Sequence, residues 1–151
     1  MRTGQTTSAG LWRFARDYAV AADAAQKAAG DRFSHPVYFL HGRSIELALK
    51  AFLVARGTPY KTLKFRPYGH DIMMLLKEAR RRRLGQFVKL GRAELLSLKH
   101  LNDEYSAKNY EYIVTGSFVA PGLIGLTLIT WSLVTSLERF CINAAYPDSS
   151  T

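Results

Sequence analysis

The chain has 151 residues, 48% of them hydrophobic and 22% charged, a composition that excludes a disordered chain and indicates one soluble globular domain. Its single cysteine, Cys141, excludes an intramolecular disulfide and a cysteine-based zinc cluster. The chain contains 21 lysines and arginines against 12 aspartates and glutamates, so its net charge is +9. Net charge bears on partners rather than on fold, and this excess favours an anionic partner.

A first helix is predicted between a capping residue at Thr7 or Ser8 and a stop at Gly30. Small apolar residues recur along it at heptad-like spacing, which would let a neighbouring helix approach closely. We expect one domain over residues 8–145 and a tail over residues 146–151.

A second helix is predicted from Pro36 to Gly57, and it is apolar nearly all round, as is typical of the central helix of a bundle. Arg43, Glu46 and Lys50 interrupt it at spacings that place them in one line on the helix surface. Such a line is either a polar site inside the bundle or a self-neutralising structural ladder, because buried charges are costly unless they are paired. The ladder is the favoured interpretation.

The middle of the chain is predicted to form a loop and two helices. Prolines predict a loop over residues 58–68. A third helix opens at Gly69-His70-Asp71 and ends in the arginine run, with Gly85 as its stop. A fourth helix is predicted from about Ala93 to Lys108, followed by an irregular connection over residues 109–121.

The last predicted helix, from residue 123 to about residue 144, follows a charge-free stretch that extends from Tyr112 to Leu137. That length raises a transmembrane alternative. Pro121-Gly122 interrupts the stretch, however, and its remainder is shorter than the roughly 20 residues that a bilayer requires. We therefore expect a buried bundle helix, no membrane association and a cytoplasmic location. The fold class predicted overall is all-α, an antiparallel bundle of four to five helices.

The positive charge is concentrated in one part of the chain. Between Arg56 and Arg92 there are 11 basic and two acidic residues, a net +9, while the rest of the chain is neutral. The cations predicted to contact phosphates are Arg80, Arg81, Arg82, Arg83, Lys89 and Arg92. The alternative is a solvated helix end whose cations complement the helix dipole.

Three stretches of the chain resemble the HEPN superfamily. They are residues 38–53, which contain the sequence IELALKA, then Gly69-His70-Asp71-Ile72, and finally a stretch over residues 101–110. HEPN proteins commonly carry IELALKA, GHDL and LN..Y...RY at these places. The resemblance covers about residues 10–145 and implies a bundle of four to five antiparallel helices, often a homodimer. In the third stretch the family-like residues are Tyr105, Lys108, Asn109 and Tyr110.

Many HEPN proteins are metal-independent ribonucleases, often toxins or defence components, whose catalytic signature is an arginine and a downstream histidine with four to six residues between them. None of the four histidines here follows an arginine at that spacing. Cleavage of RNA without a metal requires a base near the 2′-hydroxyl and a cation for the developing phosphate charge, and His70 with Arg66 supplies those types. The favoured alternative is that His70 only holds the loop by a hydrogen bond.

The leading hypothesis is thus a dimeric HEPN-like domain that binds RNA or a nucleotide through its basic region and lacks the standard nuclease motif. One alternative is a ribonuclease or toxin with an antitoxin partner. Another is a non-catalytic partner of a nucleotidyltransferase-like protein. No cofactor is expected, and no metal site, because His70 and Asp71 are adjacent and do not converge on one ion.

Overall fold

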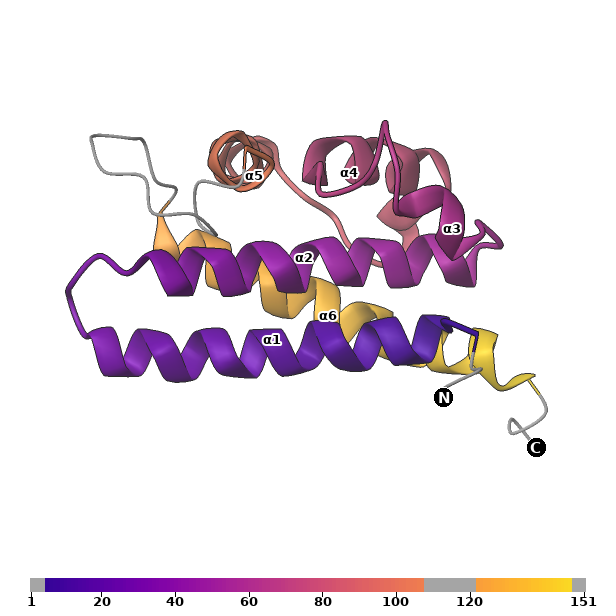
Figure 1. Cartoon of the computed structure of the whole chain (residues 1–151), viewed down its shortest axis with the longest axis horizontal. Helices are drawn as coiled ribbons and strands as arrows, with labels where there is room; N and C mark the ends of the chain where they lie inside the picture. The colour runs from indigo at the N-terminus through magenta and orange to yellow at the C-terminus, as the bar shows by residue number, and fades with distance from the viewer. Residues whose placement is uncertain (1–4, 108–121, 148–151) are drawn as a thin grey trace.

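The computed structural model describes residues 5–107 and 122–147, and every regular element within them is helical (Figure 1). The elements are α1 (Ser8–Ala29), α2 (His35–Ala55), α3 (Tyr60–Leu63), α4 (Ile72–Arg81), the short 3-10 helix η1 (Leu84–Gln86), α5 (Arg92–Tyr105) and α6 (Leu123–Ala145). The predicted all-α class is confirmed. The five helices expected from the sequence are present, and α3 and η1 are additional.

The ends of α1 are set by the residues that the sequence indicates. The Thr7 hydroxyl oxygen accepts a hydrogen bond from the Gly10 backbone nitrogen at 3.0 Å, which satisfies one of the free donors of the first turn. Gly30 ends the helix with a φ of 61°, in the left-handed region that glycine adopts without steric cost.

Helices α1 and α2 run antiparallel, side by side (Figure 1). They approach closely because the residues of α1 between them are small, Ala15 and Ala19 both being fully buried. The hydroxyl of Ser44 on α2 donates a hydrogen bond to the Ala15 carbonyl oxygen at 2.7 Å. This bond joins the two backbones at the middle of the pair.

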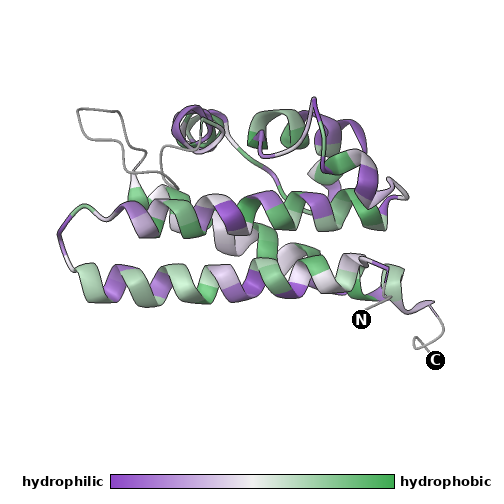
Figure 2. Ribbon diagram, viewed as in Figure 1, coloured by the Kyte–Doolittle hydropathy of each residue, from purple (hydrophilic) through white to green (hydrophobic). Residues whose placement is uncertain are grey.

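Helix α2 is the central helix of the bundle, as predicted. Fourteen of its 21 residues are buried, and it contacts α1, α4, α5 and α6. Figure 2 shows hydrophobic residues along most of its length, with a few hydrophilic turns between them. Those hydrophilic turns include buried charges, which therefore need partners inside the bundle.

Helix α6 crosses behind α1 and α2 (Figure 1). Two hydrogen bonds fix it to α1, from the Trp12 indole nitrogen to the Val134 carbonyl oxygen at 2.7 Å and from the Ser8 hydroxyl to the Cys141 carbonyl oxygen at 2.6 Å. By length and composition alone, α6 is also apolar enough to cross a membrane, a test that core helices of soluble proteins also pass. Here one face of α6 is buried against the bundle. That face comprises Leu126, Ile129, Thr130, Leu133, Val134, Leu137 and Cys141.

Three predicted boundaries are wrong. The predicted loop contains α3, a single helical turn that packs on the core through the fully buried Leu63. Helix α4 ends at Arg81, inside the arginine run as predicted, but its stop is not Gly85. Arg83 takes a left-handed backbone (φ 71°), after which Leu84 is buried in the core. Helix α5 ends at Tyr105, before the predicted Lys108. The predicted connection over residues 109–121 lies outside the described residues.

Arg56, the first cation of the basic segment, is folded onto the protein instead of extending into solvent. Its guanidinium carbon lies 5.4, 5.6 and 4.8 Å from the ring centroids of Phe52, Phe87 and Phe140. The three rings come from α2, from the residue after η1 and from α6, so this cation–π contact helps to close the bundle. Arg56 therefore has a structural role that the charge count along the sequence does not indicate.

Candidate functional site

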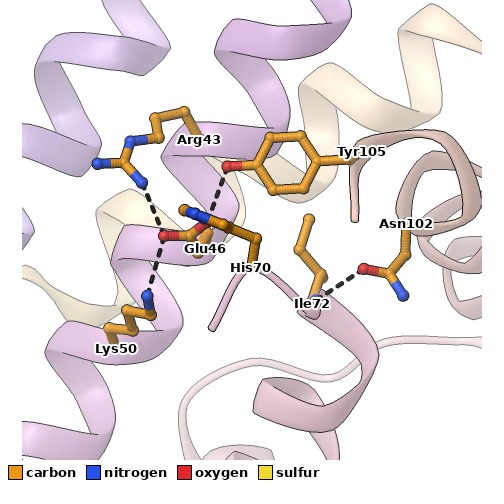
Figure 3. A network of polar contacts seen from close by, with 7 residues as sticks. All are labelled: Arg43, Glu46, Lys50, His70, Ile72, Asn102 and Tyr105. Carbon is orange, nitrogen blue, oxygen red and sulfur yellow. Dashed lines mark hydrogen bonds and ion pairs between the residues drawn. The ribbon is translucent and has the colours of Figure 1, made fainter. Parts of the chain in front are cut away.

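The polar centre of the molecule is the carboxylate of Glu46, whose side chain is fully buried (Figure 3). Its Oε2 accepts from Arg43 at 2.9 Å and from Lys50 at 3.1 Å. Its Oε1 accepts from the Tyr105 hydroxyl at 2.8 Å and pairs with Nδ1 of His70 at 2.7 Å. We call these five residues the Glu46 network. Four partners on two oxygens leave this buried anion well satisfied.

The Glu46 network joins three separate parts of the fold. Arg43, Glu46 and Lys50 belong to α2, as the spacing in the sequence predicts, while His70 precedes α4 and Tyr105 ends α5. The predicted charged line is therefore present, and it is larger than the ladder expected from α2 alone.

The Tyr105 ring reaches Glu46 by packing directly on the backbone of α2. A Cβ atom at Gly42 would lie 2.5 Å from Cδ2 of Tyr105. This is a steric clash, so only glycine fits at this position with the ring where it is. Tyr105 also lies edge-on to the His70 ring, at 6.4 Å between centroids. Gly42 is thus the residue that lets α5 come close enough to share the carboxylate.

The electrostatics of the network favour an ionised Glu46. Burial raises the pKa of Glu46, but the hydrogen bond from His70 and the charges of Lys50 and Arg43 outweigh it, and the net pKa is lowered. Burial, together with the charge of Glu46, raises the pKa of Tyr105, so its hydroxyl stays protonated and donates. With Glu46 ionised, Nδ1 of His70 carries the proton that Oε1 accepts.

A second set of contacts holds the start of α4 against α5. The Asn102 amide oxygen accepts from the Ile72 backbone nitrogen at 2.7 Å (Figure 3). The Asn102 amide nitrogen donates to Asp71 at 3.1 Å. Asp71 also caps α4 by accepting from the Met74 nitrogen at 3.1 Å. These bonds fix the position of His70, which directly precedes Asp71.

His70 and Arg66, the candidate base and cation, line the same open hollow of about 770 Å³, whose other walls include Met74 and Ser106. The His70 side chain is 41% exposed. Because Nδ1 donates to Glu46, Nε2 is the ring nitrogen left with a lone pair. An oriented imidazole beside an exposed guanidinium is an arrangement that can take a proton from a hydroxyl and bind the adjacent phosphate.

The structure divides the arginine run into two parts. Arg81 forms a two-bond fork with Glu78 at 2.7 and 2.9 Å, and Arg82 donates to the same carboxylate at 3.1 Å. These hydrogen bonds, first from Arg81 and then from Arg82, lower the pKa of Glu78 to about 2. The four arginines therefore do not act as one block, because two of them share a counter-charge.

The remaining predicted cations are exposed and make no ion pair within residues 5–107 and 122–147. Arg80 and Lys89 line a hollow of about 280 Å³ together. Arg92 is the first residue of α5, where a cation opposes the positive end of the helix dipole. Helix-dipole complementarity, the alternative to phosphate binding, thus accounts for Arg80 and Arg81 at the end of α4 but not for Arg92.

The predicted site residues fall into separate places. The hollow of Arg66 and His70 shares no lining residue with the hollow of Arg80 and Lys89. Of the family-like stretch, Tyr105 lies in the Glu46 network, whereas Lys108, Asn109 and Tyr110 lie outside the described residues.

A buried polar residue that the sequence placed simply in the core is His41. It is fully buried, and its Nδ1 lies 2.8 Å from the Thr130 hydroxyl on α6, whereas its Nε2 has no partner among the described atoms. Burial lowers the pKa of His41 to about 4, and the charge of Asp23 only partly opposes this effect. Only one of the two ring nitrogens of His41 thus has a hydrogen-bond partner among the described atoms. No pattern in the sequence indicates whether a buried histidine has one partner or two.

Two other kinds of chemistry have little support in the described part of the chain. No three His, Cys, Asp or Glu side chains in it are grouped closely enough to hold a metal ion. Burial raises the pKa of Cys141 to about 12, so its thiol stays protonated at neutral pH and is a poor nucleophile.

Comparison of the chain with protein-family models, with curated proteins and with solved structures finds no match. A functional assignment therefore depends on the residues and geometry described above.

Proposed function

We propose that this chain is a HEPN-like domain that binds RNA through its exposed cations between residues 61 and 92. The observation that carries the proposal is the placement of charge. The basic segment has two acidic residues, and both have partners within the protein. Glu78 accepts hydrogen bonds from Arg81 and Arg82, and Asp71 accepts one from the Met74 nitrogen at the start of α4. The other cations of that surface have exposed side chains that can bind phosphate.

The positions that carry the HEPN resemblance support the family part of the proposal. Glu46, His70, Asn102 and Tyr105 come from three sequence stretches that are far apart, and in the fold they meet in two contacting sets of polar residues. Motif residues that converge in this way are more informative than isolated sequence matches. The homodimer that the resemblance implies stays a prediction, and sedimentation equilibrium of the purified chain tests it.

The binding proposal predicts a salt-dependent affinity that depends on particular cations. We expect the double variant Arg80→Gln/Lys89→Gln to weaken binding to a single-stranded RNA and to reduce the slope of log affinity against log salt by about 1–2 units. Fluorescence anisotropy at several salt concentrations measures both quantities.

The matched control is the double variant Arg13→Gln/Lys27→Gln. It removes the same charge from two exposed positions of α1, outside the basic segment, and should leave the slope near that of the wild type. If the wild type has no measurable affinity for RNA, or if both double variants weaken binding equally, the proposed surface is wrong.

A second candidate function is metal-independent RNA cleavage by His70 and Arg66. The observation that favours it is the orientation of His70, whose Nδ1 is held by a buried carboxylate in a hollow shared with Arg66. In this reaction Nε2 of His70 would accept the proton of a 2′-hydroxyl, whose oxygen attacks the adjacent phosphorus. The bond from phosphorus to the 5′-oxygen breaks, the leaving 5′-oxygen takes a proton from water, and Arg66 would stabilise the charge that develops on the phosphate.

Cleavage predicts that the wild type degrades single-stranded RNA in the presence of a chelator and that His70→Gln slows this by roughly 10²–10⁴-fold, the usual contribution of a general base. His100→Gln removes a half-buried histidine of α5 and serves as the control. Intact RNA after incubation with the wild type, or equal rates for the wild type and His70→Gln, would leave binding as the only function supported.

A further inference from the structure

Aromatic rings alternate with cations in the segment between α2 and α4 (residues 56–71), which we call the α2–α4 connection. No acidic residue occurs in it before Asp71. The alternating residues are Tyr60, Lys61, Lys64, Phe65, Arg66 and Tyr68. Its cations belong to the basic segment, but they are not among the cations around α4 and α5 that the sequence predicts to contact phosphates.

Phe65 is the most informative of these residues because its side chain faces solvent. It is 63% exposed, whereas Leu63, two residues earlier, is fully buried in the core. The neighbouring side chains of Lys64 and Arg66 are exposed as well. A phenyl ring left in water between two cations adds nothing to the core, but it presents a flat apolar face beside positive charge.

The residues of the α2–α4 connection line two hollows. One hollow, of about 690 Å³, is lined by Tyr60, Lys61, Lys64 and Phe65 together with the start of α1 and the end of α6. The other is the hollow of Arg66 and His70, which Tyr68 also lines. A chain that crosses Phe65 would therefore meet cations and aromatic rings on either side.

One cation on this segment, Lys64, packs against an aromatic ring of the same segment. The ammonium nitrogen of Lys64 lies 5.2 Å from the centre of the Tyr60 ring, a cation–π contact. This contact holds the charge close to an aromatic face. Positive charge next to stacking surfaces is the combination by which proteins bind unpaired nucleic acid strands.

We infer that the α2–α4 connection is a stacking site for unpaired bases, with Phe65 as its platform, and that the protein therefore prefers single-stranded RNA to duplex RNA. This inference rests on the proposed RNA binding and adds base stacking to the phosphate contacts of the same basic segment. Cations alone attract both forms of RNA through their phosphates. An exposed ring discriminates between them, because the bases of a duplex are already paired and stacked on one another.

The test compares two probes, a single-stranded RNA of about 12 nucleotides and the duplex of the same strand with its complement. Phe65→Leu keeps an apolar side chain but removes the flat ring. We expect it to lower single-strand affinity on the order of tenfold and to leave duplex affinity unchanged. The variant Phe65→Trp, which keeps a flat ring, should bind the single strand as tightly as the wild type does. Because Phe65 is exposed, the unfolding midpoint should stay that of the wild type.

The matched control is Phe33→Leu, whose ring is 52% exposed. Phe33 precedes the first residue of α2 and Phe65 follows its last, and this helix of 21 residues is roughly 30 Å long. Phe33→Leu should leave both affinities unchanged. Equal affinity of the wild type for single strand and duplex, or a Phe65→Leu variant that binds as the wild type does, would overturn the stacking site while RNA binding through the cations stands. A wild type that binds neither probe would overturn both proposals.

Discussion

Replacing Glu46 by glutamine is expected to lower the free energy of unfolding by about 3–5 kcal/mol, the usual cost of removing one partner from a buried ion pair. The reason is the surroundings of the carboxylate. Lys50 is almost fully buried and pairs with no other acidic residue in the described part of the chain, so the substitution leaves its charge uncompensated. Tyr105 and His70 also lose their charged acceptor.

Urea denaturation of Glu46→Gln and Glu78→Gln side by side measures this effect. Both glutamates pair with two cations three and four residues away, but the partners of Glu78 are exposed, so its loss should cost at most about 1 kcal/mol. Equal losses in the two variants would contradict the central role of the Glu46 network. Its position also implies that any change in Glu46 disturbs the orientation of His70.

The part of the Glu46 network that lies within one helix could be predicted from the sequence. Spacings of three and four residues place Arg43, Glu46 and Lys50 together on any α-helix. The contributions of His70 and Tyr105 could not be predicted from local spacing, because they depend on how α4 and α5 pack on α2. Gly42 was the available signal, since a glycine inside a strongly predicted helix often marks a close approach of another element.

The same limit applies to the basic region. Glu78 pairs with Arg81 and Arg82, three and four residues later, a spacing from which this pairing could have been predicted. The hollow lined by Arg80 and Lys89 depends on the turn at Arg83, whose backbone is left-handed. Arginine rarely adopts this conformation, so the turn could not be predicted from residue preferences. The sequence thus locates the charge, whereas the turn after α4 decides which cations lie together.

Acid is expected to destabilise this protein well before its carboxylates titrate, because His41 is buried in its neutral form. The folded-state pKa of His41 is lowered to about 4 from the usual 6.5, so between these values the unfolded chain binds a proton that the folded chain does not. Stability therefore falls as the pH decreases through this range. From about pH 7 to about pH 5 the contribution of His41 amounts to a loss of about 2 kcal/mol.

The variant His41→Gln isolates this contribution, because it removes the titrating group from the site between α2 and α6. It should be less stable than the wild type at neutral pH, since the buried site must accommodate an amide, yet its unfolding free energy should change by about 2 kcal/mol less over the same pH interval. Since Glu46 and Glu78 both have lowered pKa values, their protonation falls below this interval and does not mask the difference. An identical pH dependence in the wild type and His41→Gln would mean that His41 accepts a proton in the folded state as readily as in the unfolded chain.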